Sequence, residues 1–157
     1  MNFLKAGMHK LPEYMQLRQA VESNALPAVA TGLSGIHKAT IINALVQDTN
    51  KTALLLAADE AEAQRICQDL TSMGLRSFIY PTRDFTFRNV ESASREYEHQ
   101  RIQVLSRILK HDCDVVVACM DAALQYTIPP NELEGRMIEL KKGQTVSLEQ
   151  VVQSLVR

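Results

Sequence analysis

The residues of this sequence that are most suggestive of chemistry lie in the segment 32–39, which reads GLSGIHKA. It can be compared with the phosphate-binding motif G-x-x-x-x-G-K-S/T, in which backbone amides and a lysine hold phosphates and a hydroxyl holds magnesium. Gly32 and Lys38 fall in register with that motif. His37 stands at the second glycine position, and Ala39 stands at the hydroxyl position. The segment therefore keeps the lysine and lacks two groups that a nucleotide and its metal need.

The two replacements have direct chemical consequences. A histidine side chain obstructs the close approach of backbone amides to phosphate, and an alanine methyl group offers no oxygen to magnesium. Thr40 lies one residue too late, which on a helix rotates its hydroxyl by about 100°. We therefore expect no catalytic, metal-binding or cofactor-binding residue here. The residues of the vestigial loop are Gly32, Gly35, His37, Lys38 and Ala39.

The retained groups leave two alternatives open. Lys38 at a helix N-terminus would attract an anion, because free amides and the helix dipole favour negative charge there. We prefer a solvated lysine on a structural turn. In a working ATP-binding domain, Gly32, Gly35 and Lys38 would instead cradle the phosphates. His37 has no metal-binding partner at ligand spacing, so we interpret it as a surface or cap histidine.

Acidic residues follow two of the apolar runs. Residues 54–60, LLLAADE, imitate the strand and acidic pair that hold magnesium in nucleotide hydrolases. We reject that interpretation, because Asp59 and Glu62 have the spacing of a capping box and the run follows the loop helix too soon. Asp121, after the valine-rich run, is likewise predicted to be the N-cap of a helix over 122–126.

Aromatic and basic residues alternate after Tyr80. This tyrosine could stack on the bases of a single-stranded nucleic acid, together with the aromatic residues Phe85 and Phe87 and the interleaved Arg83 and Arg88. We favour a loop whose aromatic side chains fold onto the domain edge. Dispersed basic residues and a formal net charge of −1 give a nucleic acid little electrostatic attraction. A single-strand-binding module is therefore kept as a second alternative function.

Basic residues on the expected long helix have acidic neighbours. The basic positions are Arg95, Arg101 and Arg107, and the acidic ones are Glu91, Glu96 and Glu98. Opposite charges at helical spacing stabilise an exposed helix by a small amount. We therefore expect this face to be solvated.

Cysteine usage and hydropathy indicate the cellular setting. Cys67, Cys113 and Cys119 show neither C-x-x-C spacing nor an even count, which is typical of a reduced protein whose cysteines act as small hydrophobic residues. No apolar run has the length of a secretory signal or a membrane span. We expect a cytoplasmic protein.

Strands and helices are expected to alternate along the chain. Segments of strand length that are mostly apolar occupy 28–31, 53–58, 76–80 and 115–119, and of these 53–58 and 115–119 are continuous apolar runs. Apolar residues at helical spacing occupy 11–23, the segment after the glycine loop, the segment from Asp59 to Met73, and a long segment that starts near Ser92 or Ser94. Buried strands that alternate with helices predict an α/β fold with a doubly wound, mostly parallel sheet.

The character of the sequence changes past Tyr126. Two prolines interrupt the pattern, 137–140 has the composition of a short strand, and Ser147, with a glutamine three residues later, predicts the start of a last helix. We therefore expect an α/β domain over 1–127 and the beginning of a second, small α+β module over 128–157.

Six segments, in this order, resemble the N-terminal region of bacterial transcription-repair coupling factors. They read ATGLSGIHKA, LLLAADEAEAQRICQDL, YPTRDFTF, SREYEHQRIQVLSRIL, DVVVACMDAALQ and RMIELKKGQTVSLEQVVQSLV. The likeness covers residues 11–157 and rests on the series of segments more than on one diagnostic motif.

That region is in turn similar to the repair helicase subunit UvrB. The resemblance implies a degenerate P-loop NTPase fold of the helicase RecA-like type. UvrB has glycine and threonine where this chain has His37 and Ala39. It also has a long aromatic hairpin that engages DNA, for which the few residues between Tyr80 and Ser92 leave no room. No DNA-contact residue is therefore carried over.

The resemblance also implies partners. Proteins of this family recognise stalled RNA polymerase, displace it from double-stranded DNA with a separate motor that uses ATP and magnesium, and recruit UvrA. We expect this chain to be a non-catalytic scaffold that contributes to UvrA recruitment and regulates the motor through contacts with other domains. In the family, UvrA binds the module that 128–157 begins, through residues beyond Arg157, so no contact residue is named. No membrane contact is expected.

Overall fold

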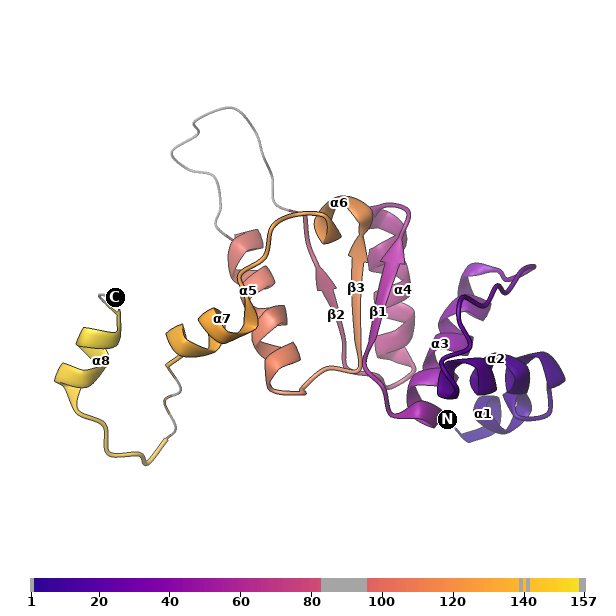
Figure 1. The fold of residues 1–157 in the computed structure, drawn as a ribbon, viewed down its shortest axis with the longest axis horizontal. Helices are drawn as coiled ribbons and strands as arrows, with labels where there is room; N and C mark the ends of the chain where they lie inside the picture. The colour runs from indigo at the N-terminus through magenta and orange to yellow at the C-terminus, as the bar shows by residue number, and fades with distance from the viewer. Residues whose placement is uncertain (1, 83–95, 139, 141, 156–157) are drawn as a thin grey trace. The chain divides into compact units, whose positions relative to one another are not determined.

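The computed structural model of the chain describes residues 2–82, 96–138, 140 and 142–155 (Figure 1). The chain divides into two compact units, Met1–Gln125 and Tyr126–Arg157. Several residues named above lie outside the described ranges. They are Arg83, Phe85, Phe87, Arg88, Glu91, Ser92, Ser94 and Arg95.

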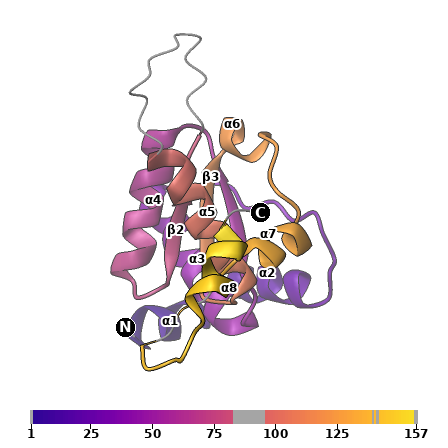
Figure 2. The same cartoon turned by 90° about the vertical axis from the view of Figure 1, so that its left-hand side faces the viewer.

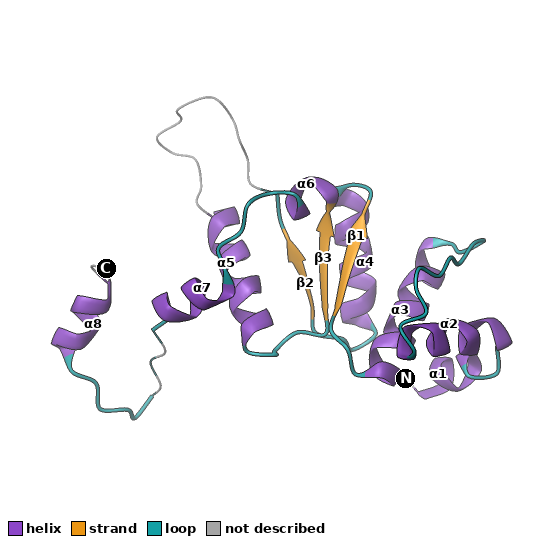
Figure 3. Ribbon diagram, in the orientation of Figure 1, coloured by secondary structure: helices purple, strands orange, loops and turns teal. Residues whose placement is uncertain are grey.

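The first unit is built on a three-stranded parallel sheet (Figure 3). Its strands are β1 (Ala53–Ala57), β2 (Ser77–Tyr80) and β3 (Val115–Cys119), in the order β1-β3-β2. Strands β1 and β3 consist of apolar residues and β2 has one polar residue, the buried Ser77, because a strand covered on both faces has no polar side to show to water. The predicted α/β class, with a parallel sheet, is confirmed.

Helices cover the two faces of this sheet. Helix α4 (Glu60–Ser72) follows β1 and helix α5 (Glu96–Leu109) precedes β3. Val115 and Val117 of β3 pack with α4, whereas Val116 of the same strand packs in a second cluster with α5. Figures 1 and 2 show both helices running alongside the strands. The core therefore has two layers of side chains, one on each face of β3.

The described residues of the first unit form four further helices. They are α1 (Asn2–Met8), α2 (Pro12–Glu22), α3 (Gly35–Thr49) and α6 (Met120–Ala123). Helix α2 confirms the helix predicted over 11–23, with Leu11 as its N-cap. Helix α1 was not anticipated. None of the helices in the described ranges is both long and apolar enough to cross a membrane.

The strand predicted over 28–31 is wrong. These residues are exposed and belong to no strand, and Val29 is 86% exposed. A strand needs a neighbour to which its backbone can bond, and the described strands pair only with one another. The composition of these four residues alone could not show whether a neighbouring strand is present.

The second unit contains helices α7 (Pro130–Arg136) and α8 (Leu148–Leu155). Helix α8 begins one residue after Ser147, as predicted. The strand predicted over 137–140 is wrong at its described positions, which lie outside any strand. Helix α7 has a proline in its first turn. Backbone N–H groups in the first turn make no hydrogen bond within the helix, so a proline there costs nothing. This proline therefore starts a helix, whereas we expected only an interruption of the pattern.

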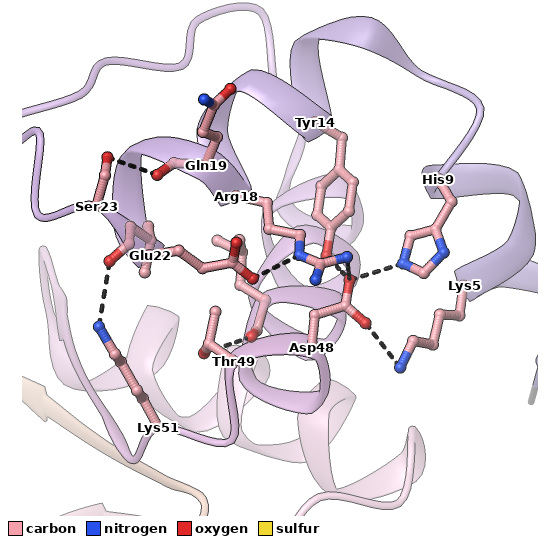
Figure 4. A network of polar contacts seen from close by, with 12 residues as sticks. Lys5, His9, Tyr14, Arg18, Gln19, Glu22, Ser23, Asp48, Thr49 and Lys51 are labelled. Atoms are coloured by element: carbon pink, nitrogen blue, oxygen red, sulfur yellow. Dashed lines mark hydrogen bonds and ion pairs between the residues drawn. The ribbon is translucent and has the colours of Figure 1, made fainter.

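A polar cluster joins α1 and α2 to α3 (Figure 4). Its centre is the carboxylate of Asp48, whose side chain is 4% exposed. Tyr14 donates its hydroxyl at 2.6 Å, His9 places Nε2 at 2.7 Å, and Lys5 places Nζ at 2.7 Å. Arg18 lies farther away, at 3.8 Å. Residues more than thirty positions apart are thus held by one carboxylate.

The cluster fixes the charge states of Asp48 and Tyr14. Burial alone would raise the pKa of Asp48, but hydrogen bonds from Lys5, Tyr14 and His9 outweigh burial and hold this pKa well below its usual range. Burial and the hydrogen bond to Asp48 both raise the pKa of Tyr14. Asp48 is therefore an anion that accepts from a neutral phenol.

We predict that Asp48→Asn lowers the free energy of unfolding by about 1–3 kcal/mol, because an amide is a poorer acceptor for these donors. Urea denaturation followed by circular dichroism measures the change. Because the folded-state pKa is depressed, the contribution of Asp48 is complete above the unfolded-state pKa of about 3.9. It is lost only as the pH falls through the lower folded-state pKa, so the two proteins should differ in stability throughout the neutral range.

Glu22→Gln is the matched control for this prediction. Glu22 pairs with Arg18 on the exposed face of α2, and such a pair contributes no more than about 0.5 kcal/mol. If Asp48→Asn changed the stability as little as this control does, the cluster would not hold the three helices together.

Candidate functional site: the loop before helix α3

The loop that carries the vestigial motif leads directly into α3. Gly32 has a φ of +75°, a left-handed conformation that glycine adopts without strain. Ser34 is the N-cap of the helix, although its side chain makes no capping hydrogen bond. Its hydroxyl instead lies 3.1 Å from Nδ1 of His37. The imidazole is thus bound by the loop's own serine.

The hydroxyl position of the motif is part of the core. Ala39 is fully buried and packs in the cluster on the α4 face of the sheet. Thr40, the next residue, donates its hydroxyl to the carbonyl oxygen of Ile36 at 2.8 Å, one turn earlier in the helix. Ala39 therefore offers no side-chain oxygen to a metal ion, and the Thr40 hydroxyl is bound to the backbone of its own helix.

Lys38 contacts a carboxylate of the same protein. Its Nζ lies 3.3 Å from Oε1 of Glu62 in α4, and about half of the lysine side chain is exposed. The second oxygen of Glu62 accepts from the backbone N–H of Ala58 at 3.0 Å. These hydrogen bonds, first that from Ala58 and then that from Lys38, lower the pKa of Glu62. An anion that approached Lys38 would meet a negative charge already in place.

Helix α4 starts with the predicted capping box. The carboxylate of Asp59, the N-cap, accepts from the backbone N–H of Glu62 at 2.7 Å. Asp59 and Glu62 therefore satisfy backbone groups at a helix start, which confirms the capping interpretation of Asp59. Asp121 does not act in the same way, because Cys119 is the N-cap of α6 and Asp121 lies in its first turn. The capping prediction for Asp121 is wrong, since α6 begins one residue earlier than expected.

A crevice of about 410 Å³ lies where the three parallel strands end. Its described lining residues are Ala58, Asp59, Glu60, Thr82, Tyr97, Cys119 and Asp121. Open α/β sheets usually bind ligands at this edge. Three of these residues, Asp59, Glu60 and Asp121, carry carboxylates, which makes this described part of the crevice acidic. The sequence analysis did not find this crevice, although a polar residue (Asp59, Thr82 or Asp121) stands two positions after the end of each strand.

Two side chains that we expected to find at the surface are buried. Tyr80 was a candidate for stacking on nucleic-acid bases, and Arg101 was expected on the solvated face of a helix. Tyr80 is buried, and the guanidinium of Arg101 lies over its ring at 4.0 Å. Arg101 is 4% exposed and donates to the carbonyl oxygen of Pro81 at 2.8 Å and to Gln125 at 3.0 Å. The prediction that Arg101 lies on a solvated face is therefore wrong. Tyr80 is not available for stacking on a base.

The cysteines are buried and unpaired, as predicted. Burial raises the pKa of the Cys67 and Cys113 thiols, which keeps them protonated. Among the described residues, no group of three histidine, cysteine or acidic side chains is arranged to hold a metal ion.

Comparison with known proteins shows a similarity to part of a repair protein. No protein-family model matches the chain. Over 128 residues, or 80% of its length, the chain is 29% identical to the transcription-repair-coupling factor of Bacillus subtilis (strain 168). The matched segment makes up 11% of that protein. The chain is thus similar to a small part of a much longer polypeptide that is named for coupling transcription to repair.

Proposed function

We propose that this chain is a non-catalytic scaffold module of a transcription-repair coupling factor and acts in transcription-coupled nucleotide excision repair. The proposal that the module is non-catalytic rests on one observation: the motif residues of the loop are already in contact with other groups of the same chain. Ser34 contacts the imidazole of His37, Glu62 pairs with Lys38, and the core encloses Ala39. The similarity to the Bacillus subtilis factor supports the setting in repair.

The conformation of the chain before the loop supports the same proposal. In a phosphate-binding loop, a strand and a helix hold the glycine turn so that its amides converge on one anion. Here helix α3 is present, but residues 28–31 are exposed and belong to no strand. The turn at Gly32 is therefore held on one side only. We propose that the fold is a degenerate relative of P-loop NTPases in which this support has been lost.

The full function belongs to the longer polypeptide in this proposal. ATP and magnesium would act in separate motor domains, and RNA polymerase and double-stranded DNA would be bound by the whole protein. The present chain would contribute contacts with UvrA and with the other domains, and through these would regulate the motor. The setting would be the bacterial cytoplasm. Because Tyr80 is internal, no described residue favours a single-strand-binding function.

We expect that Mg-ATP titrated into the protein gives no heat of low-micromolar binding, because the lysine is paired and the metal position is in the core. Isothermal titration calorimetry measures this directly. Lys38→Ala and Lys10→Ala, a control on an exposed lysine, should both leave the titration unchanged. Low-micromolar binding that Lys38→Ala abolishes and Lys10→Ala preserves would instead establish a working ATP-binding domain.

UvrA should be captured by the full-length factor of Bacillus subtilis and not by this chain alone. The reason is that the resemblance places the UvrA-contacting residues beyond Arg157. A pull-down with purified UvrA, in which the two proteins are immobilised at equal density, tests the expectation. Capture by the present chain at a level comparable to the full-length factor would contradict it and would place a UvrA contact within residues 1–157.

A further inference from the structure

We draw no further inference here: the strongest candidate, the apolar surface of Leu54 and Leu56 at the edge of β1 that no described strand pairs with, carries none, because nothing in the structure shows what covers it.

Discussion

Burial of strand β3 is the constraint on which the rest of the first unit depends. Its five residues are buried on both faces, and β1 and β2 pair with its two edges. Removing one aliphatic side chain of this kind from water contributes about 1.5–3 kcal/mol, whereas an exposed ion pair such as Lys38 with Glu62 contributes about 0–1 kcal/mol. The positions of α4 and α5 therefore follow from the apolar faces of β3, and the polar contacts adjust to them.

Polar side chains around this core have structural partners. Glu62 both completes the start of α4 and pairs with the lysine of the vestigial loop. Arg101 connects Pro81, the residue after β2, to Gln125, two residues after α6, and its guanidinium also covers Tyr80. Lys38 belongs to a nucleotide-binding motif and Tyr80 to a possible nucleic-acid surface, but in this structure both side chains contact other parts of the same fold. This use supports the scaffold role proposed above.

Local patterns were enough to predict the central parts of the fold. The valine-rich run 115–119 is a strand because each residue is apolar, and Asp59 starts a helix because its carboxylate reaches an N–H three residues later. Features that depend on distant residues could not be predicted in this way. Residues 28–31 have strand composition but no neighbour, and the burial of Arg101 depends on acceptors twenty or more positions away.

The same limit applies to the candidate site. Comparison with the motif identified the missing glycine and hydroxyl, because these are properties of single positions. The partner of Lys38 could not be predicted, since Glu62 is 24 residues away and appeared in the sequence only as part of a helix cap. Predicting the acidic crevice requires knowing the order of the three strands in the sheet, and no single segment of the sequence determines that order.

The attachment of α1 and α2 has a consequence for how the protein opens. Tyr14 is the buried residue of α2, so little apolar surface holds this helix, and the carboxylate of Asp48 supplies much of the remaining contact. Segments with few buried apolar side chains open at a lower free energy than the sheet they adjoin. The amino-terminal helices should therefore detach as one body while β1, β2 and β3 stay folded, and their amide protons should exchange with solvent deuterium first.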